Sequence, residues 1–446
     1  MKRVAIIGAG ITGLSIGFYL KKAGIPFTIF EKTNRSGGVI KSERKNGFIF
    51  ERGPNTGVIA GLELADLLIE LEKSLPIVYA DEKSKKRLIL KNNHWHALPD
   101  GVFSAIKTPL FSFEDKLKVA TEFFRKKENY ETETLAETVK RRLGKSILDY
   151  AIDPFVSGVY AGDADKLITK YAFPKLYNLE DRYGSFIRGS FQLSKKRSKE
   201  YKQKVNKKIF SFENGLQQLP DLLSEIIGKN HFRFNQNNFK IEFIKNNNFK
   251  IKNEYFSHVI TTVKPKGLSE ITNFLPESFL KIMYRMKYAK IVHINLGFQN
   301  WNGINIDAFG GLIPQKENKN LLGLLFMSSQ FPNRAPKDGA LFSVFMGGIK
   351  KPQIIDYEDS KIKKILSKEF MDLFEIEEFN PSLFEINRYK SAIAQYGTES
   401  KEKLMAINEI EKKYPGFYIQ GSIKDGIGIS DRISQAYHIS QKIKNS

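Results

Sequence analysis

The sequence predicts an α/β protein of several domains, in which a βαβ unit is joined to a mixed-β unit and to an α-helical insertion. Three observations predict this fold class. The chain has 446 residues, which is more than one hydrophobic core usually serves. Residues 2–7 form an apolar run that is followed by glycines, by a helix-period stretch to Lys22 and by a second apolar run at residues 26–30. Helical and strand-like segments then alternate along the rest of the chain.

The later elements are predicted from their hydrophobic periodicity. Helical spacing marks residues 62–73 and returns, with many charges, over residues 111–150, which indicates an α-rich insertion. Short alternating segments predict strands over residues 232–263, separated by N-N-N at 246–248 and by K-N at 252–253. Residues 291–348 are also strand-like. A last strand at 417–420 leads into a helix that begins near Asp431.

The composition limits the chemistry that the chain can perform. Hydrophobic residues make up 41% and aromatic residues 12%, which fits a globular protein with enough rings to line an apolar cavity. The chain contains no cysteine, so disulfides, thiolate metal sites, iron–sulfur clusters and a cysteine nucleophile are excluded. Its six histidines show no metal-binding or triad spacing, and we expect no metal. Any redox chemistry must therefore belong to a bound cofactor.

The formal net charge of +22 favours contact with an anionic partner. No nucleic-acid motif is present, so we expect no nucleic acid. The longest basic run, residues 194–208, fits either a solvated face or a surface that meets anionic lipid. We expect no signal peptide, because a predicted strand occupies the first residues, and no apolar stretch reaches the about 18 residues that a spanning helix needs. We expect a cytoplasmic protein, or one bound peripherally to the cytoplasmic face of the inner membrane.

The first βαβ unit carries a dinucleotide-binding signature. The sequence V-A-I-I-G-A-G-I-T-G-L places Gly8, Gly10 and Gly13 in G-x-G-x-x-G spacing between a strand and a helix, with Ala9, Ile11 and Thr12 between them. The three glycines permit a tight turn, close approach of a pyrophosphate, and close helix–strand packing. The pyrophosphate would sit at the helix N-terminus. Glu31 ends the second strand, where its carboxylate can accept hydrogen bonds from ribose hydroxyls.

The segments after Glu31 favour FAD over NAD. Gly37 and Gly38 follow closely, and E-R-G-P-N-T occupies residues 51–56. Together with Y-P-G-F-Y-I-Q-G-S-I-K-D-G-I-G-I-S-D near the C-terminus, they resemble the FAD signature of the amine-oxidase-like flavoprotein superfamily. The resemblance implies non-covalent FAD, and it adds to the glycine turn and Glu31 the cofactor-binding residues Lys32, Gly37, Gly38, Val39, Gly53, Pro54, Asn55, Thr56, Phe239, Gly426, Ile427, Gly428 and Ile429. The last four would lie along the isoalloxazine ring.

Four further segments resemble the oxygen-dependent porphyrinogen oxidases, which comprise protoporphyrinogen oxidase and its coproporphyrinogen-oxidising relatives. They are D-P-F-V-S-G-V-Y-A-G-D at 153–163, F-S-F-E-N-G-L-Q-Q-L-P at 210–220, L-L-F-M-S-S-Q-F-P-N-R-A-P at 324–336 and V-F-M-G-G at 344–348. They follow the family's order, and the resemblance spans essentially the whole chain. The first of the four is quite specific to this family.

The resemblance assigns six substrate-positioning residues and no acid–base pair. Arg87 matches an arginine thought to pair with a substrate propionate, as a bidentate guanidinium–carboxylate pair would orient a macrocycle. Asn55 matches a position over the flavin, and Gly158 a glycine whose carbonyl faces the reacting part of the substrate. The apolar residues that would clamp the rings are Leu312, Leu325 and Phe345.

Three positions depart from the family pattern. Ala394 stands where the family has proline in I-P-Q-Y, and the aromatic residue common near Lys401 is absent. Gly421-Ser422 replaces the usual G-N or G-A before the last glycine loop. These changes leave FAD binding expected but weaken any inference about the geometry at the flavin edge.

The resemblance implies a Rossmann-like FAD-binding domain of the amine-oxidase/p-hydroxybenzoate-hydroxylase type, a mixed-β substrate domain and an α-helical, membrane-binding insertion. The expected limits are 1–78, 206–265 and 388–446 for the FAD domain, 79–95 and 266–387 for the substrate domain, and 96–205 for the insertion.

The implied reaction is oxidation of protoporphyrinogen IX to protoporphyrin IX in heme biosynthesis, with dioxygen as the acceptor. The implied partners are the porphyrinogen, dioxygen, an anionic membrane surface, ferrochelatase and a second copy of the chain. Three alternatives remain open. They are coproporphyrinogen III as the substrate, an amine oxidase, and a non-catalytic basic flavin-binding module.

Overall fold

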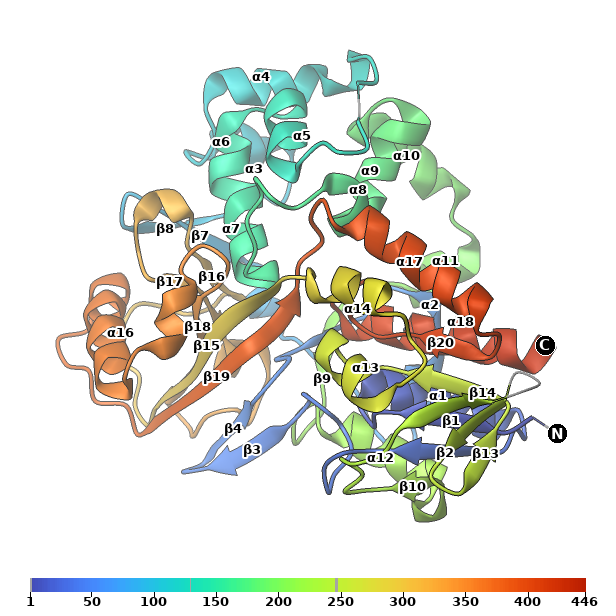
Figure 1. The fold of residues 1–446 in the computed structure, drawn as a ribbon. Helices are drawn as coiled ribbons and strands as arrows, with labels where there is room; N and C mark the ends of the chain where they lie inside the picture. Colours follow the sequence, from blue (N-terminus) through green and yellow to red (C-terminus); the bar gives the residue numbers. More distant parts are fainter. Residues whose placement is uncertain (1, 129, 245–247) are drawn as a thin grey trace.

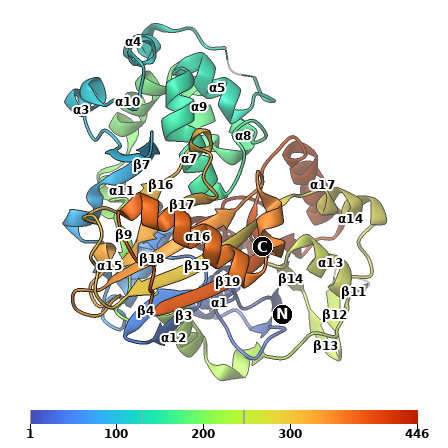
Figure 2. The same cartoon turned by 90° about the vertical axis from the view of Figure 1, so that its left-hand side faces the viewer.

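A computed structural model describes residues 2–128, 130–244 and 248–446 of the chain. The predicted fold class is confirmed, because a parallel sheet with helices, a mixed sheet and a group of helices form three parts of the molecule (Figures 1 and 2). The helices of residues 102–204 form the upper part in both views, and both ends of the chain lie in the part built on the parallel sheet (Figure 1).

The parallel sheet has, within the described residues, five strands in the order β10-β2-β1-β14-β20. Their bounds are β1 Val4–Ile7, β2 Phe27–Phe30, β10 Phe232–Arg233, β14 His258–Thr261 and β20 Phe417–Ile419. Val4 pairs with Phe27 on one side and with His258 on the other. The strands are almost entirely apolar because both faces of the sheet are covered.

The two faces of this sheet can be read from the alternation of side chains along β1. Ile6 belongs to one core, which it shares with α1 (Ile11–Lys22), α2 (Leu62–Leu71), α12 (Gln218–Ile227) and α18 (Ile429–Asn445). Ala5 and Ile7 belong to a second core. That core is shared with α13 (Pro265–Ile271), α14 (Glu277–Tyr284), α17 (Ser400–Lys413) and a small sheet of β11 (Ile241–Ile244), β12 (Asn248–Ile251) and β13 (Glu254–Phe256). Of the predicted N-N-N separator, residues 246 and 247 lie outside the described residues.

The mixed sheet has the strand order β19-β15-β18-β17-β16-β7-β8 in the part of the chain that the structure describes. The strands are β7 Arg87–Lys91, β8 His94–Ala97, β15 Tyr288–Phe298, β16 Gly310–Leu312, β17 Leu321–Phe326, β18 Ala340–Gly347 and β19 Leu383–Ala394. Among the described strand pairs of this mixed sheet, only β7 and β16 run parallel, and the other neighbours are antiparallel. Helix α16 (Asp359–Phe374) packs on one face through Ile362, Leu366 and Phe370 (Figure 2). The other face contacts the nucleotide-binding part, where Ser343 and Asn295 donate hydrogen bonds to Asn55 and Glu51.

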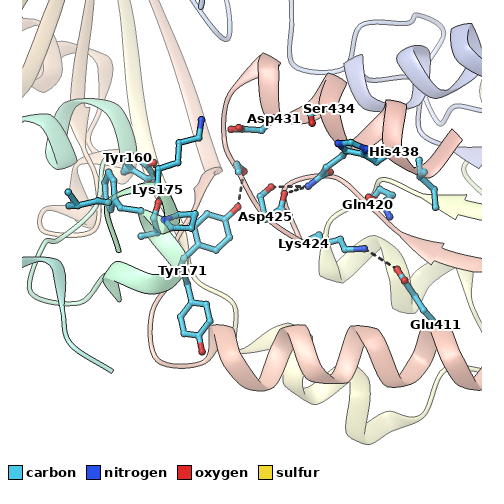
Figure 3. Close-up of a pocket in the computed structure, with 18 of the residues that line it drawn as sticks. Tyr160, Tyr171, Lys175, Glu411, Gln420, Lys424, Asp425, Asp431, Ser434 and His438 are labelled. Carbon is cyan, nitrogen blue, oxygen red and sulfur yellow. Dashed lines mark hydrogen bonds and ion pairs between the residues drawn. The ribbon is translucent and has the colours of Figure 1, made fainter. Parts of the chain in front are cut away.

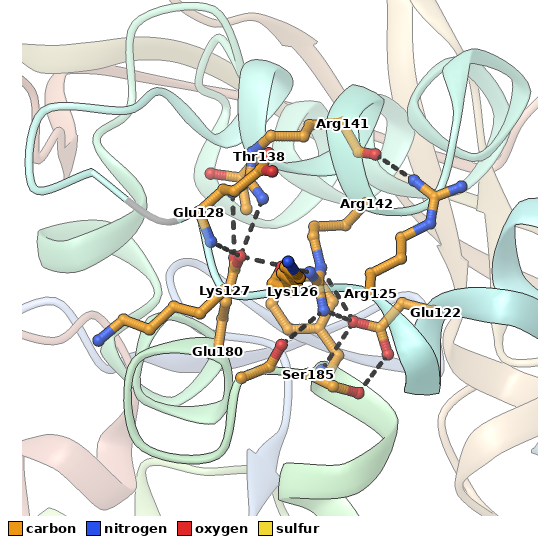
Figure 4. Close-up of polar contacts among 12 residues, drawn as sticks. Glu122, Arg125, Lys126, Lys127, Glu128, Thr138, Arg141, Arg142, Glu180 and Ser185 are labelled. Carbon is orange, nitrogen blue, oxygen red and sulfur yellow. Dashed lines mark hydrogen bonds and ion pairs between the residues drawn. The ribbon is translucent and has the colours of Figure 1, made fainter.

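The helical insertion connects β8 to β9 (Ile209–Ser211). Its elements include α3 Val102–Lys107, α4 Phe113–Thr121, η2 Glu122–Phe124, α5 Leu135–Arg142, α6 Lys145–Ile147, η3 Leu148–Ile152, α7 Asp153–Phe155, η4 Val156–Tyr160, α8 Thr169–Ala172, α9 Pro174–Tyr183, α10 Phe186–Lys196 and α11 Lys199–Lys204. Its interior contains ionic side chains (Figure 4). Arg142 is 1% exposed, and its Nε donates to Oε1 of the fully buried Glu122 over 2.9 Å. Glu122 also accepts hydrogen bonds from Ser185 Oγ and from the amides of Phe186 and Ile187.

Two small sheets complete the fold. They are the pair β3 (Ser42–Lys45) and β4 (Phe48–Glu51), and the set of β5 (Gly57–Val58), β9 and β6 (Val78–Tyr79). The predicted domain limits stay a prediction; β19 extends across the limit at residue 388 and pairs with β15 as far as Ala394. The described part of the chain contains no helix that is both long and apolar enough to span a membrane.

Candidate active site

The glycine turn lies between β1 and α1, as the sequence predicts. Gly8 has a φ of 105°, a conformation that side chains other than glycine's rarely adopt. A Cβ on Gly13 would overlap the carbonyl oxygen of Gly8, so Gly13 is required by helix–strand packing. Among the described residues, the atom nearest to a Cβ on Gly10 would be Gly38 Cα, at 4.0 Å. The space at Gly10 is therefore open to a ligand at the N-terminus of α1.

The second glycine pair lies directly beside this turn. The amide of Gly37 donates to the carbonyl of Ala9 over 2.8 Å, and Gly37 forms a parallel bridge with Gly10. Gly38 has a φ of 59° and approaches Gly10 closely. The side chain of Val39 is 62% exposed, and its backbone leaves no room for a Cβ on Gly53. Three segments of the predicted FAD signature thus meet around one exposed apolar residue.

Glu31 lies at the carboxyl end of β2 and is 8% exposed. Its carboxylate accepts hydrogen bonds from the amide of Ala9 over 2.8 Å and from the amide and hydroxyl of Thr33 over 2.9 and 2.8 Å. A carboxylate offers about four lone-pair positions, so it retains one for a ribose hydroxyl. Lys32 follows on the surface, and Phe239 packs against Phe30 with ring centroids 5.5 Å apart.

The C-terminal glycine loop reaches the same region. A Cβ on Gly8 and a Cβ on Gly421 would both lie close to Thr262, which places the start of the loop beside the glycine turn. Gly426 has a φ of 62°. Helix α18 begins at Ile429, two residues before the predicted start, because Gly428 is its N-cap and Asp431 accepts hydrogen bonds from the amides of Ile427 and Gly428 over 3.1 and 3.0 Å. The predicted flavin-edge residues therefore form the entry to a helix.

The predicted substrate residues of the mixed sheet lie on one face. Gly310 pairs with Arg87 and with Leu325, so these two side chains share a row. Leu312 and Phe345 both pair with Gly323 and share the next row. The intervening residues Leu324, Val344 and Met346 face α16 instead. Because side chains alternate along a strand, the four predicted residues lie on the face opposite α16.

Two contacts place the remaining predicted residues against this face. A Cβ on Gly158 would overlap Leu312, so the π-helical turn of η4 lies directly on the sheet. The hydroxyl of Ser343 donates to Asn55 Oδ1 over 2.6 Å, which joins the E-R-G-P-N-T segment to the sheet. Arg87 is exposed, lies over the ring of Phe309 at 5.5 Å, and has no acidic partner among the described residues. Its guanidinium is free to meet a carboxylate.

The sequence interpretation missed polar residues on the same face. His293 pairs with Phe345 and Asn387, and its ring stacks on Phe345 with centroids 4.9 Å apart and an interplanar angle of 10°. The residue is 1% exposed, and burial lowers the pKa of His293 to about 4. Within the part of the chain that the structure describes, neither His293 Nε2 nor Asn387 Nδ2 has a hydrogen-bond partner. The alternation in I-V-H-I-N-L could have indicated that His293 and Asn295 share a face.

Glu51, at the start of E-R-G-P-N-T, is also buried. Burial raises the pKa of Glu51 to about 7, although hydrogen bonds from Ser42 and from the Leu216 amide oppose the shift. Asn295 Nδ2 donates to the Glu51 carbonyl over 3.0 Å. These contacts fix the segment that lies between the glycine turn and the mixed sheet.

The site has the features of a dinucleotide-dependent oxidoreductase. The open space at Gly10, the exposed Val39 and the lone pair left on Glu31 fit a dinucleotide cofactor. In the described ranges, no cluster of histidine and acidic residues could hold a metal ion. The glycine turn and Glu31 lie on the parallel sheet, and Asn55 joins the adjoining segment to the mixed sheet, so a bound dinucleotide would lie near both sheets.

Comparison with known proteins identifies that cofactor as a flavin. The family model of flavin-containing amine oxidoreductases matches residues 11–433, and the chain belongs to this family. Protoporphyrinogen oxidase 2 of Arabidopsis thaliana is 29% identical over 97% of this chain and 92% of the relative. Coproporphyrinogen III oxidase of Bacillus subtilis (strain 168) is 26% identical over 97% and 96%. A crystal structure of a protein from Exiguobacterium sp. 255-15 covers 100% of this chain and 99% of its own, with a TM-score of 0.79 and 21% identity.

Proposed function

We propose that the protein holds FAD non-covalently and oxidises protoporphyrinogen IX to protoporphyrin IX with dioxygen as the final acceptor. The observation that carries this proposal is the convergence of Arg87, Leu312, Leu325 and Phe345 on one sheet face, beneath Gly158. Together they offer a cation for a propionate and apolar groups for a tetrapyrrole. Plant relatives named protoporphyrinogen oxidase, among them those of Arabidopsis thaliana and Nicotiana tabacum at 29% and 28% identity, support the same substrate.

The chain's own residues bind and orient the substrate. The flavin, when bound, supplies the acceptor for hydride from the macrocycle and returns electrons to dioxygen. Arg87 pairs with a propionate and so fixes the rotation of the macrocycle about its own plane. Leu312, Leu325 and Phe345 clamp the rings and exclude water, and the Gly158 carbonyl accepts a hydrogen bond from a pyrrole N–H. Aromatisation drives the reaction, so positioning and desolvation are the main tasks of the protein.

Coproporphyrinogen III is the second candidate substrate. It carries four propionates where protoporphyrinogen IX carries two, and the net charge of +22 favours the more anionic compound. The relatives from Bacillus subtilis and Staphylococcus aureus, 26% and 25% identical, are named coproporphyrinogen III oxidase. A direct comparison of the two porphyrinogens decides between them.

The helical insertion fits a membrane-docking role. Its exposed apolar residues lie on α3, α4, η2 and α10; they include Val102, Phe103, Ile106, Phe113, Leu117, Phe124 and Phe191, at 51–83% exposure. The 194–208 basic run begins in the last turn of α10 and continues beyond it. An apolar surface bordered by lysines and arginines fits an anionic bilayer. Ferrochelatase and a second copy of the chain stay predicted partners.

The role of Arg87 can be tested in the flavin-loaded enzyme. Arg87→Ala removes the propionate pair, so KM for protoporphyrinogen IX should rise by roughly tenfold or more, as for loss of a charge-assisted pair of about 1.5–3 kcal/mol. Lys86→Ala, which removes the neighbouring exposed cation, is the matched control. Equal KM values for both variants would contradict the assignment. An enzyme that oxidises amines and neither porphyrinogen would contradict the proposed function.

A further inference from the structure

A cavity of about 750 Å³ lies between the helical insertion and the C-terminal helices (Figure 3). Its walls come from η4, α8 and α9 on one side and from α17, the loop after β20 and α18 on the other. Gly426 is its one lining residue among the predicted flavin ligands, and Arg87, Leu312, Leu325 and Phe345 do not line it. The cavity therefore adjoins the candidate active site without being part of it.

The wall from the helical insertion is aromatic. Tyr160, Tyr171 and Phe173 line it, with the apolar side chain of Leu176 beside them. The rings of Tyr160 and Phe173 pack with centroids 4.9 Å apart. Tyr160 follows Gly158 by two residues in the same π-helical turn, which links this wall to the substrate face. An aromatic wall of this kind suits a flat, conjugated ligand.

The acidic residues that line the cavity already have partners. Glu411 accepts hydrogen bonds from the amide of Ile419 over 3.1 Å and from Lys424 over 3.4 Å. Asp425 is engaged by Gln435 and by Arg432, whose Nη2 lies 3.6 Å from Asp425 Oδ1. Asp431 caps α18. Their negative charge is thus used within the protein.

Cationic groups around the cavity are less well compensated. Lys175 has no acidic partner among the described residues, and Lys442 lies over the ring of Tyr418 at 4.6 Å. Behind the wall formed by Tyr396, Lys403 is 1% exposed, and its Nζ donates no hydrogen bond within the described residues. Arg432 is 8% exposed, and its Nη2 meets Asp425 while its Nε and Nη1 have no hydrogen-bond partner among the described residues. Buried cationic groups with unmet hydrogen-bonding capacity are costly, and an anionic ligand nearby would offset part of that cost.

We propose that this cavity is a second tetrapyrrole site, which binds the porphyrin product as a flat aromatic polycarboxylate. The inference rests on the proposed function for the class of ligand. The volume falls within the about 300–1,000 Å³ typical of ligand sites. Propionates meet Lys175 and Lys442, and the macrocycle lies on the wall of Tyr160, Tyr171 and Phe173.

Occupancy of this site would act on the flavin loop. The hydroxyl of Tyr396 donates to the carbonyl of Gly426 over 2.8 Å and to that of Ser422 over 3.2 Å, and Tyr396 itself lines the cavity. A porphyrin against Tyr396 would restrain the loop. We therefore expect product inhibition that does not compete with the porphyrinogen.

Porphyrin binding to the flavin-loaded protein tests the proposal. The double variant Lys175→Glu/Lys442→Glu is compared with the control Lys412→Glu/Lys444→Glu, which changes the net charge equally at exposed positions that do not line the cavity. Protoporphyrin IX and coproporphyrin III are titrated, and quenching of porphyrin fluorescence gives stoichiometry and Kd. We expect one porphyrin to bind per chain at this cavity, and we expect its Kd to rise by roughly tenfold or more in the test variant alone.

The same titration in Arg87→Ala separates the two sites. Binding that survives Arg87→Ala but is lost with the lysines supports a second site, as does an initial rate of porphyrinogen oxidation that the lysine variant retains without product inhibition. Identical Kd values in the test and control variants would overturn the inference. The inference would also be overturned if only one porphyrin bound per chain and Arg87→Ala abolished that binding. If porphyrinogen oxidation proceeds normally in either case, the proposed function stands while the second site falls.

Discussion

His293 is buried on β15 with its Nε2 atom unpaired, beside Asn387 with its Nδ2 atom unpaired. A buried polar group without a partner lowers the free energy of unfolding by about 1–3 kcal/mol. Such groups persist where function needs them, and both lie on the face that carries Phe345 and Leu325. This face is therefore less stable than it would be if apolar side chains of similar shape replaced the two unpaired groups.

Replacement of His293 by phenylalanine tests this cost. His293→Phe keeps the stack on Phe345 and removes the unpaired nitrogen, so thermal and denaturant unfolding should show unchanged or higher stability at pH 7 and a changed KM for porphyrinogen. His231→Phe is the control, because His231 also stacks on a phenylalanine, Phe27, but its Nδ1 lies 3.1 Å from the Phe27 carbonyl oxygen. That variant should lose stability. A large loss of stability in His293→Phe would contradict the account.

The lowered pKa of His293 also sets a pH dependence. The folded protein resists protonation of this ring, so the contribution of His293 to stability is fully present above the unfolded pKa of about 6.5 and is lost as the pH falls towards about 4. Over that pH window, the free energy of unfolding of the wild type should fall by about 3 kcal/mol more than that of His293→Phe. Chemical denaturation at pH 7, 6, 5 and 4.5 measures the difference. Parallel curves would contradict it.

At the scale of elements, the glycine turn, α1 and the strands of the parallel sheet were predictable because each depends on local spacing. The convergence of Arg87 with Leu312, Leu325 and Phe345 was not, since strand order and register decide which face each side chain takes. The family resemblance supplied these residues, and the register brings their side chains to one face of the sheet. Strand β19 was missed because its alternation is mixed with charges, as in L-F-E-I-N-R-Y-K. Helix α16 was not among the predicted elements either, although the helical spacing of the apolar residues Ile362, Leu366 and Phe370 could have indicated it.

The helical insertion depends on the buried ion pair between Glu122 and Arg142 (Figure 4). Glu122→Gln leaves the buried Arg142 with only the longer ion pair from its Nη1 to Glu180 Oε1 at 3.5 Å, and the free energy of unfolding should fall by about 3 kcal/mol. Glu131→Gln, which breaks an exposed pair with Lys170, should cost less than about 1 kcal/mol. Thermal unfolding of the two variants, with limited proteolysis of the insertion, makes the comparison. Equal losses would show that the buried pair has no special role.

At the scale of the whole molecule, charge and apolar surface gather on the helical insertion. Exposed phenylalanines lie on α3, η2 and α10, and the basic residues of α10 and α11 follow them in the chain. Lys204 is paired with Asp66 and Glu200, so part of the basic run serves the protein itself. The remaining cations are available to anionic head groups.

Binding to vesicles tests this surface. Phe103→Ser/Phe124→Ser should weaken binding to anionic vesicles by roughly tenfold or more. Both phenylalanines are exposed in the protein, and each would contribute about 1.5–3 kcal/mol when the bilayer buries it. The control Ile69→Ser/Met405→Ser removes apolar residues of 55% exposure outside the insertion and should leave binding unchanged. Cosedimentation at low and high salt gives both affinities. Binding that is indifferent to lipid charge and to the phenylalanines would contradict membrane docking.

The central claim is that the face formed by Arg87, Leu312, Leu325 and Phe345 holds a porphyrinogen for oxidation by the flavin. In the most direct measurement, protein of known flavin content is mixed in air with protoporphyrinogen IX or coproporphyrinogen III. Porphyrin fluorescence and peroxide concentration are then recorded together. The account predicts porphyrin formation with flavin turnover and about three peroxides per porphyrin, as two electrons pass in each of three steps. Flavin-loaded protein that oxidises neither porphyrinogen would contradict it.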